Sequence, residues 1–187
     1  MQELSLNIMD IVQNSICAKA TVIKILVHEN KQNNLLKIEI KDNGKGINEE
    51  QINKILNPFY TTRKTRKVGL GLPLFKMAAE STGGKLEIES AINTGTTVTA
   101  TFISSSIDMT PLGDINSTIN ILIKCNPNID FIFTRSIGNL SFTLDTSFLK
   151  KTLGKEVSLD NPEVTKWIKS YLNEQTELIT NRRCNSQ

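Results

Sequence analysis

The sequence predicts an α+β fold in which helices pack on one face of a mixed, mostly antiparallel sheet. Three observations lead to this prediction: an amphipathic helical pattern opens the chain, two alternating strand patterns follow it, and a further helix precedes two more strands. Short polar turns join the strands of each pair, which favours antiparallel neighbours. Each helix has one apolar face, and the sheet is the surface on which that face can be buried.

The first helix is predicted over residues 3–18 because its apolar residues recur at three- and four-residue intervals on one broad face. A polar stripe, which can meet a ligand, runs along the other side through Glu3, Asn7, Asp10 and Asn14.

Further elements complete the first hundred residues. We expect a hairpin of strands over 21–29 and 35–41, a short helix over 48–57 that ends before Pro58, a helix from near Pro73 to Gly83, and strands over 85–91 and 97–104. The apolar face of the longer helix is expected at Leu74, Phe75, Met77 and Ala78.

The first hundred residues contain two glycine motifs, Gly44 with Gly46 and Gly69 with Gly71, and the pattern changes after Ser106, where such motifs cease. We therefore predict two parts: a larger domain over residues 1–106 that contains both motifs, and a small α/β module over 107–187 that could dock a partner. The module is expected to contain helices over 115–124, 147–153 and 162–178, strands over 131–135 and 140–144, and a frayed tail from Thr180.

Composition excludes several classes of protein. Of the 187 residues, 39% are hydrophobic and 22% are charged, as in ordinary globular proteins. A net charge of +3 gives no reason to expect nucleic-acid binding, and three scattered cysteines favour neither a disulfide framework nor a metal cluster. No apolar run is long enough to span a membrane, and the opening residues do not resemble a signal peptide. We expect a cytoplasmic protein.

Two glycine motifs indicate the chemistry. Asp42 ends a strand and is followed by Gly44 and Gly46, so a carboxylate that can accept from an amine such as that of adenine lies beside backbone that can approach a ligand closely. Gly69 and Gly71 precede a helix, whose free N–H groups would face phosphates. In this order, the two motifs predict an ATP pocket.

The stretch between the motifs contains the run Arg63-Lys64-Thr65-Arg66-Lys67. Such a run is usually a solvated loop, but here it lies where triphosphate charge is expected. The nucleotide contacts that we predict in this stretch are Thr61, Thr62, Arg63, Lys67, Gly69, Leu70 and Gly71.

With these motifs in place, the first hundred positions resemble the GHKL superfamily, the ATP-binding fold of DNA gyrase, the heat-shock chaperone, sensor histidine kinases and MutL. The resemblance implies that Asn14 binds Mg²⁺ and that Asp10 is a candidate base, although the hydrolytic branches usually carry the longer Glu there. It also implies that Asp42 reads adenine and that the Thr96 hydroxyl supports the Asp42 carboxylate. For Gly95-Thr96 alone, an ordinary hairpin turn is an equal alternative.

Two branches of the family match different parts. The stretch from Asn57 to Arg63 with Gly69-Leu70-Gly71-Leu72 is similar to the histidine-kinase lid, whereas residues 14–21 look more like the end of the MutL helix. We expect no phosphoacceptor segment ahead of the predicted domain, and we expect the sole histidine, His28, to be structural or exposed. Histidine autophosphorylation in the usual arrangement is therefore not expected.

The resulting hypothesis is an ATP- and Mg²⁺-binding enzyme that phosphorylates a separate, unidentified protein on histidine, serine or threonine. One alternative is a regulatory switch that binds nucleotide without phosphotransfer. Another is a MutL-like ATPase clamp, and a homodimer is left open.

Overall fold

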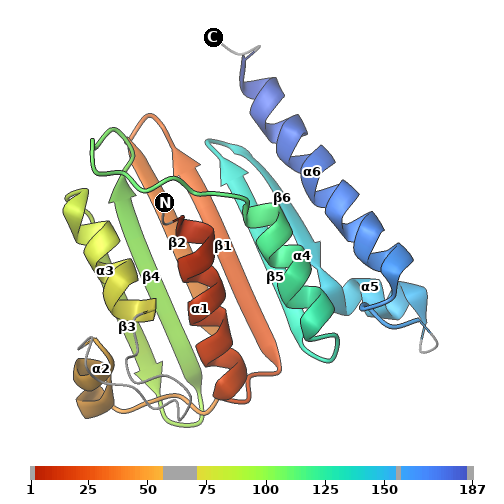
Figure 1. Ribbon diagram of the computed structural model, residues 1–187, viewed down its shortest axis with the longest axis horizontal. Coiled ribbons are helices and arrows are strands. Elements are labelled where there is room, and N and C mark those ends of the chain that lie inside the picture. Colours follow the sequence, from red (N-terminus) through yellow and green to blue (C-terminus); the bar gives the residue numbers. More distant parts are fainter. Residues whose placement is uncertain (1–2, 57–70, 155–156, 185–187) are drawn as a thin grey trace.

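The computed structural model describes residues 3–56, 71–154 and 157–184. Six strands form a single sheet in these ranges: β1 (Val22–Asn30), β2 (Leu35–Asp42), β3 (Lys85–Ala91), β4 (Gly95–Ile103), β5 (Asp130–Ile137) and β6 (Leu140–Asp145). Their order across the sheet is β3-β4-β2-β1-β5-β6 (Figure 1). Only β1 and β5 pair in parallel, so the predicted mixed, mostly antiparallel sheet is confirmed.

Helices accompany the strands along the chain: α1 (Leu4–Cys17), α2 (Glu49–Ile55), α3 (Gly71–Ser81), α4 (Ile115–Cys125), α5 (Thr146–Leu153) and α6 (Pro162–Cys184). The long helices α1, α3, α4 and α6 lie on the same face of the sheet (Figure 1). Strand side chains that point toward them, such as Ile23, Ile25 and Val27 on β1, are fully buried, and those on the opposite face are more exposed. The predicted helix-on-sheet arrangement is therefore confirmed. Within the described ranges, no helix combines the length and the apolar character needed to cross a membrane.

The segment between β4 and α4 ties the two parts of the chain together. Leu4 and Ser5 donate their backbone N–H groups to the carbonyl oxygens of Pro111 and Leu112, at 3.0 and 2.9 Å. These donors belong to the first turn of α1 and have no partner inside the helix. The connecting segment thus takes the place of a side-chain cap, which α1 lacks.

Strands from both predicted parts share the sheet. β5 and β6, which follow the predicted boundary after Ser106, continue the sheet through the pairing of β5 with β1. The boundary therefore divides the sequence without dividing the sheet, and the idea that residues 107–187 act as a docking unit stays a prediction.

Two details of the helices differ from the sequence-based expectation. α6 continues to Cys184 instead of fraying from Thr180, because Ile179 is buried and the Thr180 hydroxyl bonds back to the Thr176 carbonyl oxygen. On α3, Met77 is 60% exposed, and the buried positions are Leu72, Phe75 and Ala79. Spacing alone located the face of α3 only approximately.

Candidate functional site

The end of β2 places a carboxylate under α1. Asp42 is only 7% exposed and follows the buried residues Ile38 and Ile40 on the face toward the helices. Ser15 donates from its hydroxyl to Asp42 Oδ2 at 2.6 Å, and the Gly44 N–H donates to Asp42 Oδ1 at 2.8 Å. Each carboxylate oxygen has a further lone pair, so Asp42 can still accept a hydrogen bond from an amine.

The glycines around Asp42 are required by close backbone packing. Gly46 has a φ of +63°, and a Cβ there would lie 1.9 Å from the carbonyl oxygen of Ala91. Gly95 has a φ of +116°, and a Cβ there would lie 1.9 Å from the carbonyl oxygen of Asp42. Neither position accepts a side chain. The loop after β2 and the β3–β4 turn are thus pressed together, while direct contact of these glycines with a ligand stays a prediction.

The polar stripe of α1 is not uniformly exposed. Asn7 is buried, Asp10 is partly buried and Asn14 is exposed. Asp10 lies against the first residue of α3, because a Cβ on Gly71 would come within 3.0 Å of the Asp10 Cβ. The candidate base therefore lies beside the N-terminus of α3, where the free N–H groups of the first turn favour anions.

Thr96 pairs with Asp42 across the β2–β4 ladder, but its hydroxyl is engaged elsewhere. Thr96 Oγ1 lies 2.9 Å from Ser90 Oγ, and Ser90 also donates to the Gly95 carbonyl oxygen and accepts from the Ile47 N–H. The side-chain donor on Asp42 is Ser15. Support of the carboxylate by Thr96, which the family resemblance implied, stays a prediction.

Sequence reasoning missed both serines. Ser15 was recognisable, because positions 4, 8, 11 and 15 share the face of α1 that packs on the sheet, and Ser15 is the polar residue at the end of this row. Ser90 had no comparable signal, since it is a small residue near a turn.

Part of the predicted site falls outside the described residues: Thr61, Thr62, Arg63, Lys67, Gly69 and Leu70. Their roles stay predictions. In the ranges that the structure describes, no group of three or more His, Cys, Asp or Glu side chains could hold a metal ion. Magnesium at Asn14 would therefore depend on the amide oxygen together with phosphate oxygens and water, a ligand set that suits this ion.

A shallow hollow of about 280 Å³ lies close to the β3–β4 turn. Its walls include Lys41, Glu89 and Thr97, which alternate along their strands with the residues that face the helices. Asp42, Ser90 and Thr96, which pair across the strands in the neighbouring row, also line it. The hollow therefore lies at the end of these strands and borders Asp42.

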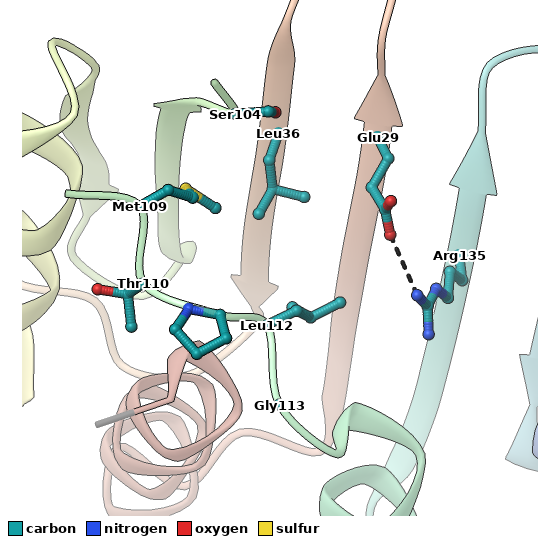
Figure 2. Close-up of a pocket in the computed structure, with 9 residues that line it drawn as sticks. Glu29, Leu36, Ser104, Met109, Thr110, Leu112, Gly113 and Arg135 are labelled. Atoms are coloured by element: carbon teal, nitrogen blue, oxygen red, sulfur yellow. Dashed lines mark hydrogen bonds and ion pairs between the residues drawn. The ribbon is translucent and has the colours of Figure 1, made fainter. Parts of the chain in front are cut away.

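A second hollow, of about 380 Å³, lies at the C-terminal end of β1, away from Asp42. The segment that connects β4 to α4 passes over it (Figure 2). Met109, Leu112 and Leu36 form apolar walls, and Glu29 and Arg135 form an ion pair of 3.1 Å at its side. Because the two charges neutralise each other, this hollow gives no indication of a charged ligand.

The sole histidine lies on the open face of the sheet. His28 Nδ1 is 2.7 Å from the hydroxyl of Ser136 on β5. The side chain therefore has a structural partner within the sheet, as expected from the sequence.

Comparison with known proteins matches the first part of the chain to a family of ATPases. A family model described as "Histidine kinase-, DNA gyrase B-, and HSP90-like ATPase" matches residues 1–105. A "Probable C4-dicarboxylate sensor kinase" of Halalkalibacterium halodurans is 42% identical over 67 residues, which are 36% of this chain and 13% of that protein. Sensor histidine kinase YvrG of Bacillus subtilis is 34% identical over 88 residues, which are 45% of this chain and 15% of the relative.

The chain thus spans less than a fifth of the length of these relatives. Among solved structures, the N-terminal domain of a DNA repair protein superposes with a TM-score of 0.54 at 19% identity, over 78% of this chain and 53% of that chain. At this level of identity the likeness concerns the fold alone.

Proposed function

Since the chain belongs to the histidine kinase-, DNA gyrase B- and HSP90-like ATPase family, we propose that it binds Mg²⁺–ATP and phosphorylates a separate protein partner. The observation that carries the nucleotide part is the buried Asp42 carboxylate, which Ser15 and Gly44 hold in one orientation. A fixed acceptor with free lone pairs suits the exocyclic amine of adenine. We also place the protein in the cytoplasm.

The other end of the nucleotide would lie toward α3. Its first turn starts at Gly71, beside Asp10, and Asn14 is one helical turn further along α1. In this arrangement Asn14 would contribute an amide oxygen to Mg²⁺, and the N–H groups of α3 would face the phosphates. Bound Mg²⁺ would neutralise phosphate charge.

Phosphotransfer would break the bond between the γ-phosphorus and the oxygen that bridges it to the β-phosphorus. The acceptor oxygen or nitrogen of the partner would bond to the γ-phosphorus, ADP would leave, and the acceptor's proton would pass to Asp10 or to water. In such reactions the protein mainly positions groups and neutralises charge. A separate partner can therefore supply the acceptor.

Replacing Asp42 tests adenine recognition. Asp42→Ala should weaken ATP binding by about 1.5–3 kcal/mol, because the amine loses a charged acceptor in a desolvated position. Titration calorimetry measures this loss, and Asp160→Ala, which removes an exposed carboxylate far along the chain, is the matched control. Equal ATP affinity in the wild type and in Asp42→Ala would remove adenine recognition from this residue.

Replacing Asn14 tests the metal contribution. Asn14→Ala should lose the part of ATP affinity that depends on Mg²⁺ and should retain adenosine binding, because only the contact with the metal is removed. If Mg²⁺ strengthens ATP binding equally in both proteins, the role of Asn14 is structural.

The short side chain of Asp10 favours a second function, a nucleotide-dependent switch without phosphotransfer. Incubation with γ-labelled ATP and protein substrates separates the two functions. Label on a partner supports the kinase, and acid-labile label indicates histidine, whereas acid-stable label indicates serine or threonine. Tight ATP binding without any labelled protein supports the switch.

A further inference from the structure

The two edge strands of the sheet differ in charge. β3 has Lys85, Glu87 and Glu89 at its exposed positions, and Lys85 pairs with Glu87 at 2.8 Å. The exposed positions of β6 are the neutral residues Ser141 and Thr143. Natural sheets protect exposed edges with charged side chains, because the unpaired N–H and C=O groups of an edge accept further strands. By this criterion β3 is protected and β6 is not.

In the described ranges, no strand other than β5 pairs with β6. Within the same ranges, no backbone hydrogen bond outside that ladder involves residues 140–145. Its free side therefore offers the row of donors and acceptors that an additional strand requires.

Helix α6 lies next to this edge and adds an apolar surface to it. Hydrogen bonds join the helix to α4, because Asn116 Nδ2 of α4 donates to the Leu172 carbonyl oxygen, to Asn173 Oδ1 and to Thr176 Oγ1. Trp167, Tyr171 and Leu178 lie on the opposite side of the helix, because each residue advances about 100° around an α-helix. This apolar stripe of Trp167, Tyr171 and Leu178 therefore faces away from α4. In Figure 1, α6 lies beyond β6 at the side of the sheet.

The apolar stripe is joined to β6 by aromatic contacts. Tyr171 packs edge-on against Phe142 of β6, with ring centroids 6.4 Å apart, and Trp167 stacks on Tyr171 at 5.3 Å. Trp167 is nevertheless 50% exposed and Leu178 is 47% exposed. A strand added beside β6 would pass next to these side chains and bury them.

We propose that the free edge of β6 and the apolar stripe of α6 form a docking site for an extended segment of another protein, with apolar and basic residues alternating with polar ones. Backbone hydrogen bonds to β6 would hold the segment. Its apolar residues would face the stripe, and polar residues would lie beside Ser141 and Thr143. Basic residues are expected because, among the described side chains of α6, the charged groups nearest to the stripe around the helix are Glu163 and Glu174, both exposed, whereas the lysines of the helix lie further round.

A second copy of the chain fits this edge less well. A two-fold pairing of β6 with β6 would place both α6 helices on the same face of the joined sheet. Because each helix lies past its own edge (Figure 1), the two would compete for the same space. A segment without its own helix at this position has no such conflict.

Trp167 is the only tryptophan in the chain and therefore reports on this surface. The probe is the peptide Lys-Thr-Val-Thr-Val-Thr-Lys, added to the full chain without nucleotide. Binding should shift Trp167 emission to shorter wavelength and reduce its quenching by acrylamide. Two analogues carry N-methyl groups on alternate backbone nitrogens, and one of them should bind at least about tenfold more weakly, because its methyl groups replace the donors that face β6.

Charge reversal provides the second arm. Glu174→Lys should weaken binding of the basic peptide by about threefold to tenfold. The same variant should strengthen binding of a second peptide, Glu-Thr-Val-Thr-Val-Thr-Glu. Glu80→Lys, which reverses an exposed carboxylate on α3, is the matched control and should change neither affinity. Circular dichroism confirms that both variants are folded.

Three results would overturn the proposal. One is the absence of any Trp167 response at millimolar peptide. Another is equal binding of both N-methylated analogues, which would show that no strand pairing occurs. The third is a blue shift that rises with protein concentration alone, together with dimers in sedimentation, which would assign the edge to a second copy. Because the assay omits nucleotide, its outcome is independent of ATP binding.

Discussion

The two halves of the sheet are stabilised in different ways. In the first half, formed by β1 to β4 with α1 and α3, glycines allow backbone segments to approach until no Cβ would fit, as at Gly46 and Gly95. In the second half, formed by β5 and β6 with α4 to α6, the turn glycines Gly138 and Gly154 have open space where a Cβ would lie, with no atom beyond their chain neighbours within 4 Å of that position. Close backbone packing is thus a feature of the first half, at Gly84 beside Thr101 as well as around Asp42.

The second half relies on side-chain packing instead. Phe133, Phe142 and Tyr171 pack edge-on in a row from β5 through β6 to α6. A polar contact between α4 and α6, centred on Asn116, lies beside this row. The difference teaches that close backbone approach characterises the first half, whereas side-chain contacts attach α6 to the second half.

Glycine substitution should separate the two halves most strongly. Gly95→Ala should destabilise the fold by at least about 3 kcal/mol, because the new Cβ would meet the Asp42 carbonyl oxygen in a backbone conformation that alanine disfavours. Gly138 also has a positive φ, of +59°, but a Cβ there would have open space around it. Gly138→Ala should therefore cost only about 1–2 kcal/mol. Urea unfolding measures the loss of stability in both variants. Equal losses would show that the two halves do not differ in their tolerance of a Cβ at these glycines.

Asn116 tests the polar contact in the second half. Asn116→Ala should cost about 1–3 kcal/mol, because its Nδ2 donates to the Leu172 carbonyl oxygen, to Asn173 and to Thr176, which would lose a buried partner. Thermal unfolding measures the loss, and ATP affinity should stay unchanged. A matching loss of ATP affinity would show that the halves are coupled.

Asn120, one turn along α4, should respond in the opposite direction. Its Oδ1 is buried without a hydrogen-bond partner among the described residues. Asn120→Leu should therefore raise the free energy of unfolding by up to about 1 kcal/mol, because an unsatisfied acceptor is replaced by an apolar group of similar size. A lower melting temperature than that of the wild type would contradict this expectation.

Asp114 should make the stability of the second half depend on pH. It caps α4 by accepting from Ser117, and these hydrogen bonds lower the pKa of Asp114 below its ordinary value of 3.8. A lowered pKa adds stability above 3.8, and this stability is lost as the pH falls through the folded-state value. Asp114→Ala should cost about 0.5–1 kcal/mol at neutral pH and less in acid. Urea unfolding midpoints, measured from neutral pH to acid, test this pH dependence, and Asp108→Ala is the control at an exposed carboxylate.

Local patterns in the sequence were sufficient for the elements and for the centre of the site. Helical spacing predicts α1 and α4, alternation predicts the strands, and Asp42 with its glycines indicates a carboxylate in a tight loop. These features depend on neighbours within a few residues, so the chain contains their signal. The length of α6 was underestimated, because the burial of Ile179 depends on a distant surface.

The tertiary structure alone decided how the halves meet. The parallel pairing of β1 with β5 joins residues about a hundred positions apart, and no local pattern specifies it. The hydrogen bond from Ser15 to Asp42 likewise depends on how α1 lies on β2. The exposure of Trp167 is decided by the position of α6 beside an edge strand. In each case the energy comes from groups that only the folded chain brings together, whereas sequence patterns report on contacts along the chain.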